Sequence, residues 1–202
     1  LPLSAAQRRL WFLNRLDGPN PAYHSVVAAS LSGPLDTHAL RAALADLAER
    51  HESLRTLYPE SDGEPRQLIL DGAAPELEIL DADRADLAEI TARPFDLATE
   101  APVRAVLLTE GPERHTLVLA LHHIATDGES WGPLLGDLSR AYRARTRGER
   151  PDWTPLPVQY ADYTLWHREL LREQGEEQLA HWRTALAGLP EELALPTDRP
   201  RP

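Results

Sequence analysis

The feature that most constrains the fold is the segment 116–123, TLVLALHH, which is apolar on both faces when extended. Side chains alternate between the two faces of a strand, and a strand that is apolar on both faces is buried at the centre of a sheet. The alternation places His123 on the face of Leu121 and His122 on the opposite face. The two imidazoles therefore cannot serve one site, so one is expected to be chemical and the other structural.

A turn and a helix follow this strand directly. Asp127-Gly128 is a strong turn signal, and glycine permits a positive φ or close approach by a ligand. A helix is expected over residues 130–145, and its free N–H groups would point towards the turn. Histidine suits proton transfer near neutral pH, so this corner is a candidate catalytic site. A buried structural histidine beside an ordinary Asp-Gly turn remains the alternative on these residues alone.

The rest of the chain predicts an α+β fold, a mixed sheet with helices packed on it. Ser4 is expected to cap a first helix that ends at Gly18-Pro19, and Asp36 a second helix. The hydrophobic patterns predict further strands over residues 23–31, 54–58, 67–70, 77–80 and 103–109, and further helices over 85–91, 159–171 and 176–186.

Composition excludes several function classes. The net charge of −11 argues against a nucleic-acid partner. Neither a Lys/Arg-rich run nor a long apolar stretch points to a membrane. The chain has no cysteine, which excludes disulfides and fits a cytoplasmic location, and no cluster with ligand spacing predicts a metal site. Methionine is absent even from position 1, so the chain is expected to be excised from a longer protein.

Five segments, in order along the chain, resemble motifs of the condensation domains of nonribosomal peptide synthetases. Residues 122–128, HHIATDG, match the HHxxxDG signature of that family. The others are 3–13 (the opening helix motif), 50–56 (RHESLRT, for RHExLRT), 160–166 (YADYTLW, for YxDYAxW) and 195–202 (the segment linking two lobes). The resemblance implies a two-lobed chloramphenicol acetyltransferase-like fold with a tunnel between the lobes. Residues 1–188 would form the N-terminal lobe, and 189–202 a linker toward a missing C-terminal lobe.

The resemblance also implies a reaction and its catalytic residue. A carrier-bound acceptor aminoacyl amine would attack a carrier-bound donor aminoacyl or peptidyl thioester, with His123 facing the tunnel. His123 would either accept the amine proton or orient the amine and stabilise charge, and the sequence does not choose between these roles. Gly128 would make room for the donor and offer its N–H to the carbonyl oxygen, although a simple turn glycine fits equally well. Ser130 would polarise the intermediate, with helix capping the better interpretation.

Three residues are expected to support this site. His122 would pack on the far face and hydrogen-bond locally. By resemblance, Asp127 would form a buried ion pair with Arg55, which is expected on a short strand, and loss of one partner would cost about 3–5 kcal/mol.

Position 129, commonly Trp in the family, is Glu129 here, in a loop that would border the tunnel.

The implied partners are donor and acceptor peptidyl carrier domains, the C-terminal lobe and a neighbouring adenylation domain. No cofactor would bind directly, because the carrier domains present the 4′-phosphopantetheine arm. The opening segment resembles the subtype that joins a D-configured donor to an L-acceptor, and the isolated lobe is expected to be inactive.

Other members of the superfamily remain as alternatives. An epimerisation domain would use the same histidine, and starter and alcohol-acylating domains share the signature. A non-catalytic recruitment domain usually has a broken HHxxxDG motif, which is intact here. Heterocyclisation is disfavoured, because that subtype replaces the signature with an aspartate-rich motif.

Overall fold

The computed structural model describes residues 1–16, 18, 20–190, 196 and 198–199 of the 202-residue chain. It divides into two units, Leu1–Leu165 and Trp166–Pro202. The strands are β1 (His24–Ser32), β2 (Thr56–Leu57), β3 (Glu60–Ser61), β4 (Glu64–Pro65), β5 (Leu68–Ile69), β6 (Leu77–Asp81), β7 (Val103–Gly111) and β8 (Arg114–His122). The α-helices are α1 (Ala5–Leu16), α2 (Thr37–Arg50), α3 (Leu87–Ala92), α4 (Trp131–Arg145) and α5 (Tyr160–Ala185). Short 3-10 helices lie at Pro21–Tyr23, Glu52–Arg55, Ala82–Arg84 and Gly128–Ser130.

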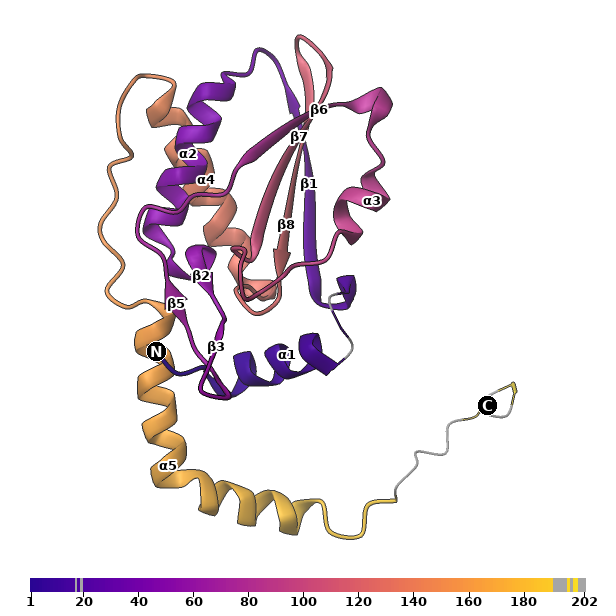
Figure 1. Ribbon diagram of the computed structural model, residues 1–202, viewed down its shortest axis with the longest axis vertical. Helices are drawn as coiled ribbons and strands as arrows, with labels where there is room; N and C mark the ends of the chain where they lie inside the picture. The colour runs from indigo at the N-terminus through magenta and orange to yellow at the C-terminus, as the bar shows by residue number, and fades with distance from the viewer. Residues whose placement is uncertain (17, 19, 191–195, 197, 200–202) are drawn as a thin grey trace. The chain divides into compact units, whose positions relative to one another are not determined.

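The main sheet has four strands in the order β1-β8-β7-β6 (Figure 1). Strand β8 pairs antiparallel with β1 and β7, whereas β6 and β7 are parallel, so the sheet is mixed as predicted. Leu119 and Leu121 of β8 belong to the core on one face, and Val118 belongs to a smaller cluster on the other. The prediction of a central strand that is buried on both faces is therefore confirmed.

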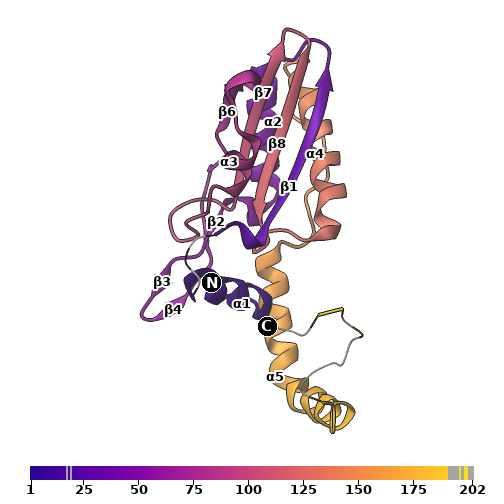
Figure 2. The same cartoon turned by 90° about the vertical axis from the view of Figure 1, so that its right-hand side faces the viewer.

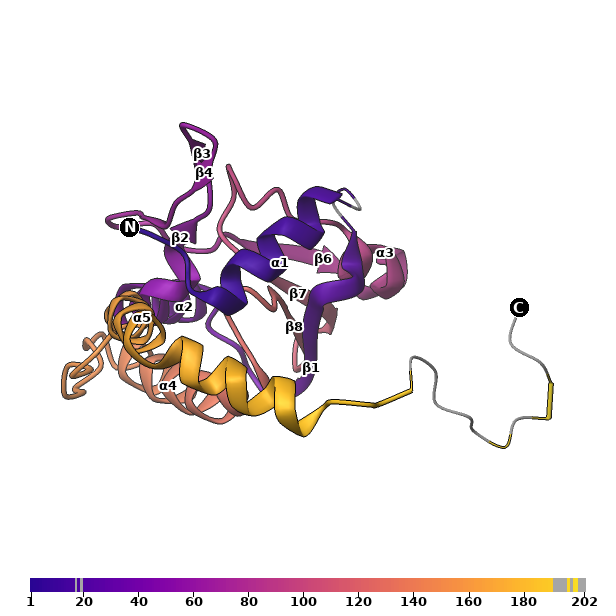
Figure 3. The same cartoon turned by 90° about the horizontal axis from the view of Figure 1, so that it is seen from below.

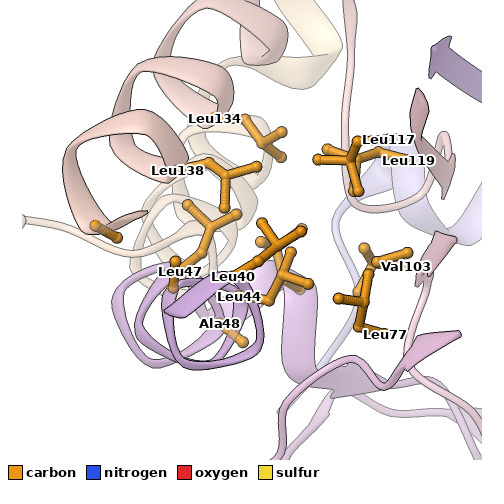
Figure 4. Close-up of a cluster of buried hydrophobic side chains, with 14 of the residues drawn as sticks. Leu40, Leu44, Leu47, Ala48, Leu77, Val103, Leu117, Leu119, Leu134 and Leu138 are labelled. Carbon is orange, nitrogen blue, oxygen red and sulfur yellow. The ribbon is translucent and has the colours of Figure 1, made fainter. Parts of the chain in front are cut away.

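Helices α2 and α4 cover one face of this sheet, and α3 lies on the other side (Figures 1 and 2). Asp36 caps α2 as predicted, with its Oδ1 accepting from the Ala39 N–H at 2.9 Å. The close-up in Figure 4 shows leucines of both helices meeting strand side chains. The labelled leucines of this core are Leu40, Leu44 and Leu47 of α2, Leu134 and Leu138 of α4, and Leu77, Leu117 and Leu119 of the strands.

Helix α1 lies across the end of the sheet at which β8 finishes (Figures 1 and 3). Ser4 and Gln7 cap it reciprocally: the Gln7 N–H donates to Ser4 Oγ at 3.1 Å, and the Ser4 N–H donates to Gln7 Oε1 at 2.9 Å. Leu10 packs with Tyr58 and with Ile124, which follows the two histidines. Helix α1 therefore packs against the residues that directly follow β8.

Two predicted elements are wrong in detail. The two helices expected over 159–171 and 176–186 form one helix, α5 (Tyr160–Ala185), because the single glycine at Gly175 costs only about 1 kcal/mol and strong helix formers flank it. The strand expected over 54–58 begins only at Thr56, because the preceding residues form the 3-10 helix Glu52–Arg55, to which the Thr56 hydroxyl bonds at 2.7 Å. The proposed linking segment 195–202 lies mostly outside the described residues, and the lobe boundary at 188 stays a prediction. None of the described helices is long and apolar enough to span a membrane.

Candidate active site

His122 is the last residue of β8 and is 1% exposed. Its Nδ1 accepts the N–H of Ile124 at 3.0 Å, and the rings of Tyr23, His24 and Phe95 surround it at centroid distances of 6.2–6.4 Å. Burial lowers its pKa to about 4, with smaller contributions from His24 and His123. His122 is therefore neutral at pH 7, and it packs and bonds locally on the face expected for it.

His123 is the first residue beyond the strand, and its side chain is exposed. Its backbone N–H donates to the Tyr23 carbonyl at 2.8 Å, and its ring Nδ1 lies 2.6 Å from the carbonyl oxygen of Thr126. A carbonyl oxygen can only accept, so Nδ1 carries the proton and Nε2 carries the lone pair in the neutral ring. The turn thus presents an exposed imidazole in the tautomer whose Nε2 accepts a proton.

Asp127 and Ser130 form a closed capping box at the start of the helical segment. Asp127 Oδ1 accepts from the Ser130 N–H at 3.1 Å and from the Ser130 hydroxyl at 2.6 Å, and the Asp127 N–H donates to Ser130 Oγ at 3.0 Å. The single hydroxyl proton of Ser130 is thereby used within the turn. This geometry favours helix capping over polarisation of an intermediate for Ser130.

The expected ion pair between Asp127 and Arg55 is not formed. The guanidinium of Arg55 instead donates to two carbonyl oxygens, of Ala48 at 2.9 Å and of Leu70 at 2.7 Å, and lies 3.5 Å from the Glu52 carboxylate. Arg55 ends a 3-10 helix rather than lying on a strand, and Asp127 is exposed while it caps its own helix. The expected Asp127–Arg55 pair is therefore wrong, and each of the two side chains bonds to groups near its own position.

Gly128 lies in open space at the start of the 3-10 helix Gly128–Ser130. A Cβ built on it would meet no atom within 4 Å, and its φ is not in the left-handed region. Its N–H donates to no group of the described residues. Neither backbone strain nor packing within the described chain therefore requires glycine here.

Asp137 is a residue near the turn that the sequence did not single out. Its Oδ2 lies 2.8 Å from both Arg50 Nε and His51 Nε2, so it joins α4 to the end of α2. A small pocket of about 220 Å³ lies beside this group and is lined in part by His51, Thr126 and Ser130. Among the described residues, no group of three His, Cys, Asp or Glu side chains could hold a metal ion.

Comparisons with known proteins match the whole chain. A family model described as "Condensation domain" matches residues 1–202. The chain is 52% identical over 217 residues to an isonitrile lipopeptide synthase of Mycobacterium tuberculosis (strain ATCC 25618 / H37Rv), and 51% identical over 214 residues to a dimodular nonribosomal peptide synthase of Bacillus subtilis (strain 168). Both alignments cover 100% of the chain, but it spans only 9% of each synthase.

A solved structure is similar over the same extent. The X-domain in the complex of the X-domain and OxyB from teicoplanin biosynthesis matches with a TM-score of 0.89 and 39% identity. The match covers 100% of this chain and 46% of the solved chain. The chain therefore spans about half the length of that relative.

Proposed function

Because the chain belongs to the condensation-domain family, we propose that it supplies one wall of the catalytic site of an amide-forming acyltransferase domain. Its fold is that of the N-terminal lobe of such domains, a chloramphenicol acetyltransferase-like lobe. The α-amine of an acceptor aminoacyl group attacks the carbonyl carbon of a donor aminoacyl or peptidyl thioester. The new C–N bond forms, the C–S bond breaks, and the amine proton passes to the leaving thiolate. Peptidyl carrier domains present both substrates on 4′-phosphopantetheine arms.

The contact between His123 Nδ1 and the Thr126 carbonyl oxygen is the observation that supports this proposal. The Nδ1–H is engaged with the Thr126 carbonyl, so Nε2 is the lone-pair nitrogen of an exposed ring. In the proposed reaction Nε2 accepts the amine proton as the C–N bond forms and returns it to the thiolate.

Gly128 is proposed to face the donor carbonyl. Its N–H is unbonded within the described chain, and the space around its Cα is open. The amide N–H would stabilise the negative charge on the oxygen of the tetrahedral intermediate. Ser130 contributes indirectly in this proposal, by closing the cap that fixes the turn.

The test uses a complete condensation domain that contains this chain, with donor and acceptor thioesters loaded on carrier domains. His123→Ala should reduce amide formation by at least about 10²-fold, the lower range for general acid–base catalysis, while circular dichroism stays native. His38→Ala, at an exposed histidine of α2, is the matched control and should retain full activity. Unchanged product formation by His123→Ala would refute the proposed role. Donors of D and L configuration, compared in the same assay, test the proposed D-donor/L-acceptor subtype.

We further propose that the 202-residue chain alone does not condense two substrates, since it spans 46% of the solved relative. Product formed by the chain alone, and abolished by His123→Ala, would contradict this.

Recruitment of a partner protein is a second candidate, favoured by the similarity to an X-domain solved in complex with OxyB. Under that function the complete domain would bind a partner protein and form no amide.

Epimerisation would instead exchange the α-proton of a single carrier-bound aminoacyl group in D₂O without joining two substrates. The intact HHIATDG segment and the free Nε2 of His123 favour condensation.

A further inference from the structure

Two buried ring nitrogens at the paired ends of β1 and β8 have no hydrogen-bond partner among the described residues: Nε2 of His24 and Nε2 of His122. The two residues face each other across the β1–β8 pair, and their ring centroids are 6.2 Å apart in an edge-on arrangement. An unsatisfied buried polar atom is costly and uncommon. Two of them on facing residues therefore call for a common explanation.

The other nitrogen of each ring determines its tautomer. Nδ1 of His24 lies 2.9 Å from the Thr91 carbonyl oxygen, so in the neutral ring Nδ1 carries the proton and Nε2 is an acceptor. Nδ1 of His122 accepts the Ile124 N–H at 3.0 Å, and since this ring is neutral at pH 7, its Nε2 carries the proton and is a donor. The two unpartnered nitrogens are thus a complementary donor and acceptor.

The separation of the rings excludes a direct hydrogen bond between the two nitrogens. A direct hydrogen bond of about 3 Å between ring nitrogens would bring the centroids closer than the observed 6.2 Å. A single water molecule can accept from one nitrogen and donate to the other across such a gap, and buried waters commonly satisfy otherwise unpaired polar groups. The ring of Phe95 lies edge-on to both histidines, with centroid distances of 5.0 Å to His24 and 6.2 Å to His122, so it borders the space between them.

We propose that His24 is a positioning residue for His123. The Nε2–H of His122 donates to one buried water, and this water donates to Nε2 of His24. The bridge fixes the His122 tautomer whose Nδ1 accepts the Ile124 N–H. The Ile124 amide belongs to the turn that carries His123, so the link runs from Thr91 at the end of α3 to the reactive ring. The positioning role rests on the proposed function of His123, but the hydrogen-bond link does not.

The first test measures tautomers directly. Long-range ¹H–¹⁵N correlation spectra of the chain with ¹⁵N-labelled histidine should show the proton on Nδ1 in His24 and on Nε2 in His122. Finding the same tautomer in both rings would overturn the proposal, since two donors or two acceptors cannot share the water in this way.

The second test uses substitutions that separate the two nitrogens of His24. His24→Gln keeps an acceptor near the Nε2 position, whereas His24→Asn keeps only a donor near Nδ1, and His24→Phe keeps neither. Hydrogen exchange of the Ile124 amide should accelerate about tenfold in the Asn and Phe variants, the effect of losing one hydrogen bond, and should stay near wild type in the Gln variant. His115→Phe is the matched control, because His115 is 8% exposed on the same strand and both of its nitrogens are unbonded.

Equal exchange in all three His24 variants would overturn the link, as would equal acceleration in His115→Phe. In a complete domain, His24→Phe should lower kcat with KM unchanged, and His24→Gln should restore it. If His123→Ala leaves amide formation intact while the tautomers are as stated, the proposed function fails and the link stands. If either ring has the opposite tautomer to the one stated while His123→Ala is inactive, the link fails and the proposed function stands.

Discussion

The Nδ1–H of His123 donates to the carbonyl oxygen of Thr126, three residues further along, at 2.6 Å. A backbone carbonyl thus orients the exposed imidazole, in the position that a carboxylate often occupies beside a reactive histidine. Asp127, the acidic residue of the same segment, bonds to Ser130 instead. The aspartate therefore shapes the turn, and its Oδ1 is engaged by Ser130 rather than by the imidazole.

Asp127→Ala should lower the free energy of unfolding by about 1 kcal/mol, the usual cost of losing a helix N-cap. Asp127→Asn should cost less, because its Oδ1 still accepts from the Ser130 N–H. Urea unfolding followed by circular dichroism measures both values.

The same measurement on Arg55→Leu, alone and combined with Asp127→Ala, tests the absence of an ion pair. The two losses should add within about 0.5 kcal/mol, as they do for independent sites. A coupling energy of several kcal/mol, with a loss of about 3–5 kcal/mol from either single change, would restore the Arg55–Asp127 pair.

Gly128→Ala should leave folding intact and impair catalysis. The new methyl group meets nothing within 4 Å, and the backbone angle is one that alanine adopts, so the unfolding midpoint should stay equal or rise slightly. In a complete domain the methyl group would crowd the donor thioester, and amide formation should fall at least about tenfold. Gly136→Ala, also in open space on α4, is the control and should retain activity. Full activity in Gly128→Ala would remove the reason for placing the donor there.

Acid should destabilise the chain through His122. Its pKa is lowered to about 4 by burial, whereas the unfolded chain takes up the same proton near pH 6.5. Between these values the unfolded state binds more protons, so stability is complete above about pH 6.5 and falls towards pH 4. The total loss is roughly 3 kcal/mol for a shift of this size.

His122→Asn isolates this contribution, because the asparagine oxygen keeps an acceptor near the Nδ1 position and does not titrate. Urea midpoints from pH 7.5 to 4.5 should fall more steeply for the wild type than for the variant. Parallel curves would mean that His122 titrates normally in the folded chain.

Asp46 ties the two helices that cover the sheet. Its carboxylate is 3% exposed and accepts from Arg145 Nε at 2.6 Å. Asp46→Asn removes the buried counter-charge of Arg145, whose own side chain is partly exposed, so it should cost about 1.5–3 kcal/mol, the usual range for a hydrogen bond to a charged group. Glu49→Gln breaks the parallel but exposed pair with Arg150, whose side chains are 70% and 72% exposed, and should cost under about 1 kcal/mol. Thermal unfolding compares the two, and equal losses would contradict the assigned role of burial.

Local chemistry made much of this fold predictable. The apolar run of β8, the cap residues Ser4 and Asp36 and the leucine spacing of α2 each depend on neighbours a few residues away. Separation of His122 from His123 also followed from strand alternation. The hydrophobic pattern predicts two helices over 159–171 and 176–186, but the strong helix formers on both sides of Gly175 continue α5 through it.

The partners of Arg55 could not be predicted in the same way. The carbonyls of Ala48 and Leu70 reach it from 7 and 15 residues away along the chain, and only tertiary packing brings them together. A recognisable local signal did exist in the Glu52–Arg55 spacing, which suits a contact within one helical turn. The opposed tautomers of His24 and His122 likewise depend on carbonyl and amide positions that a sequence does not reveal.

The β1–β8 pairing bears on how such synthetases are recombined. The Tyr23 carbonyl oxygen accepts a hydrogen bond from the His123 N–H, and His24 faces His122, although about 100 residues separate the paired segments. A chimera whose crossover lies between β1 and β8 would therefore take residues 23 and 24 from one parent and residues 122–128 from another. Such hybrids should fold well only when residues 23 and 24 of one parent are compatible with the HHIATDG segment of the other. Residues 23 and 24 should therefore be transferred together with that segment.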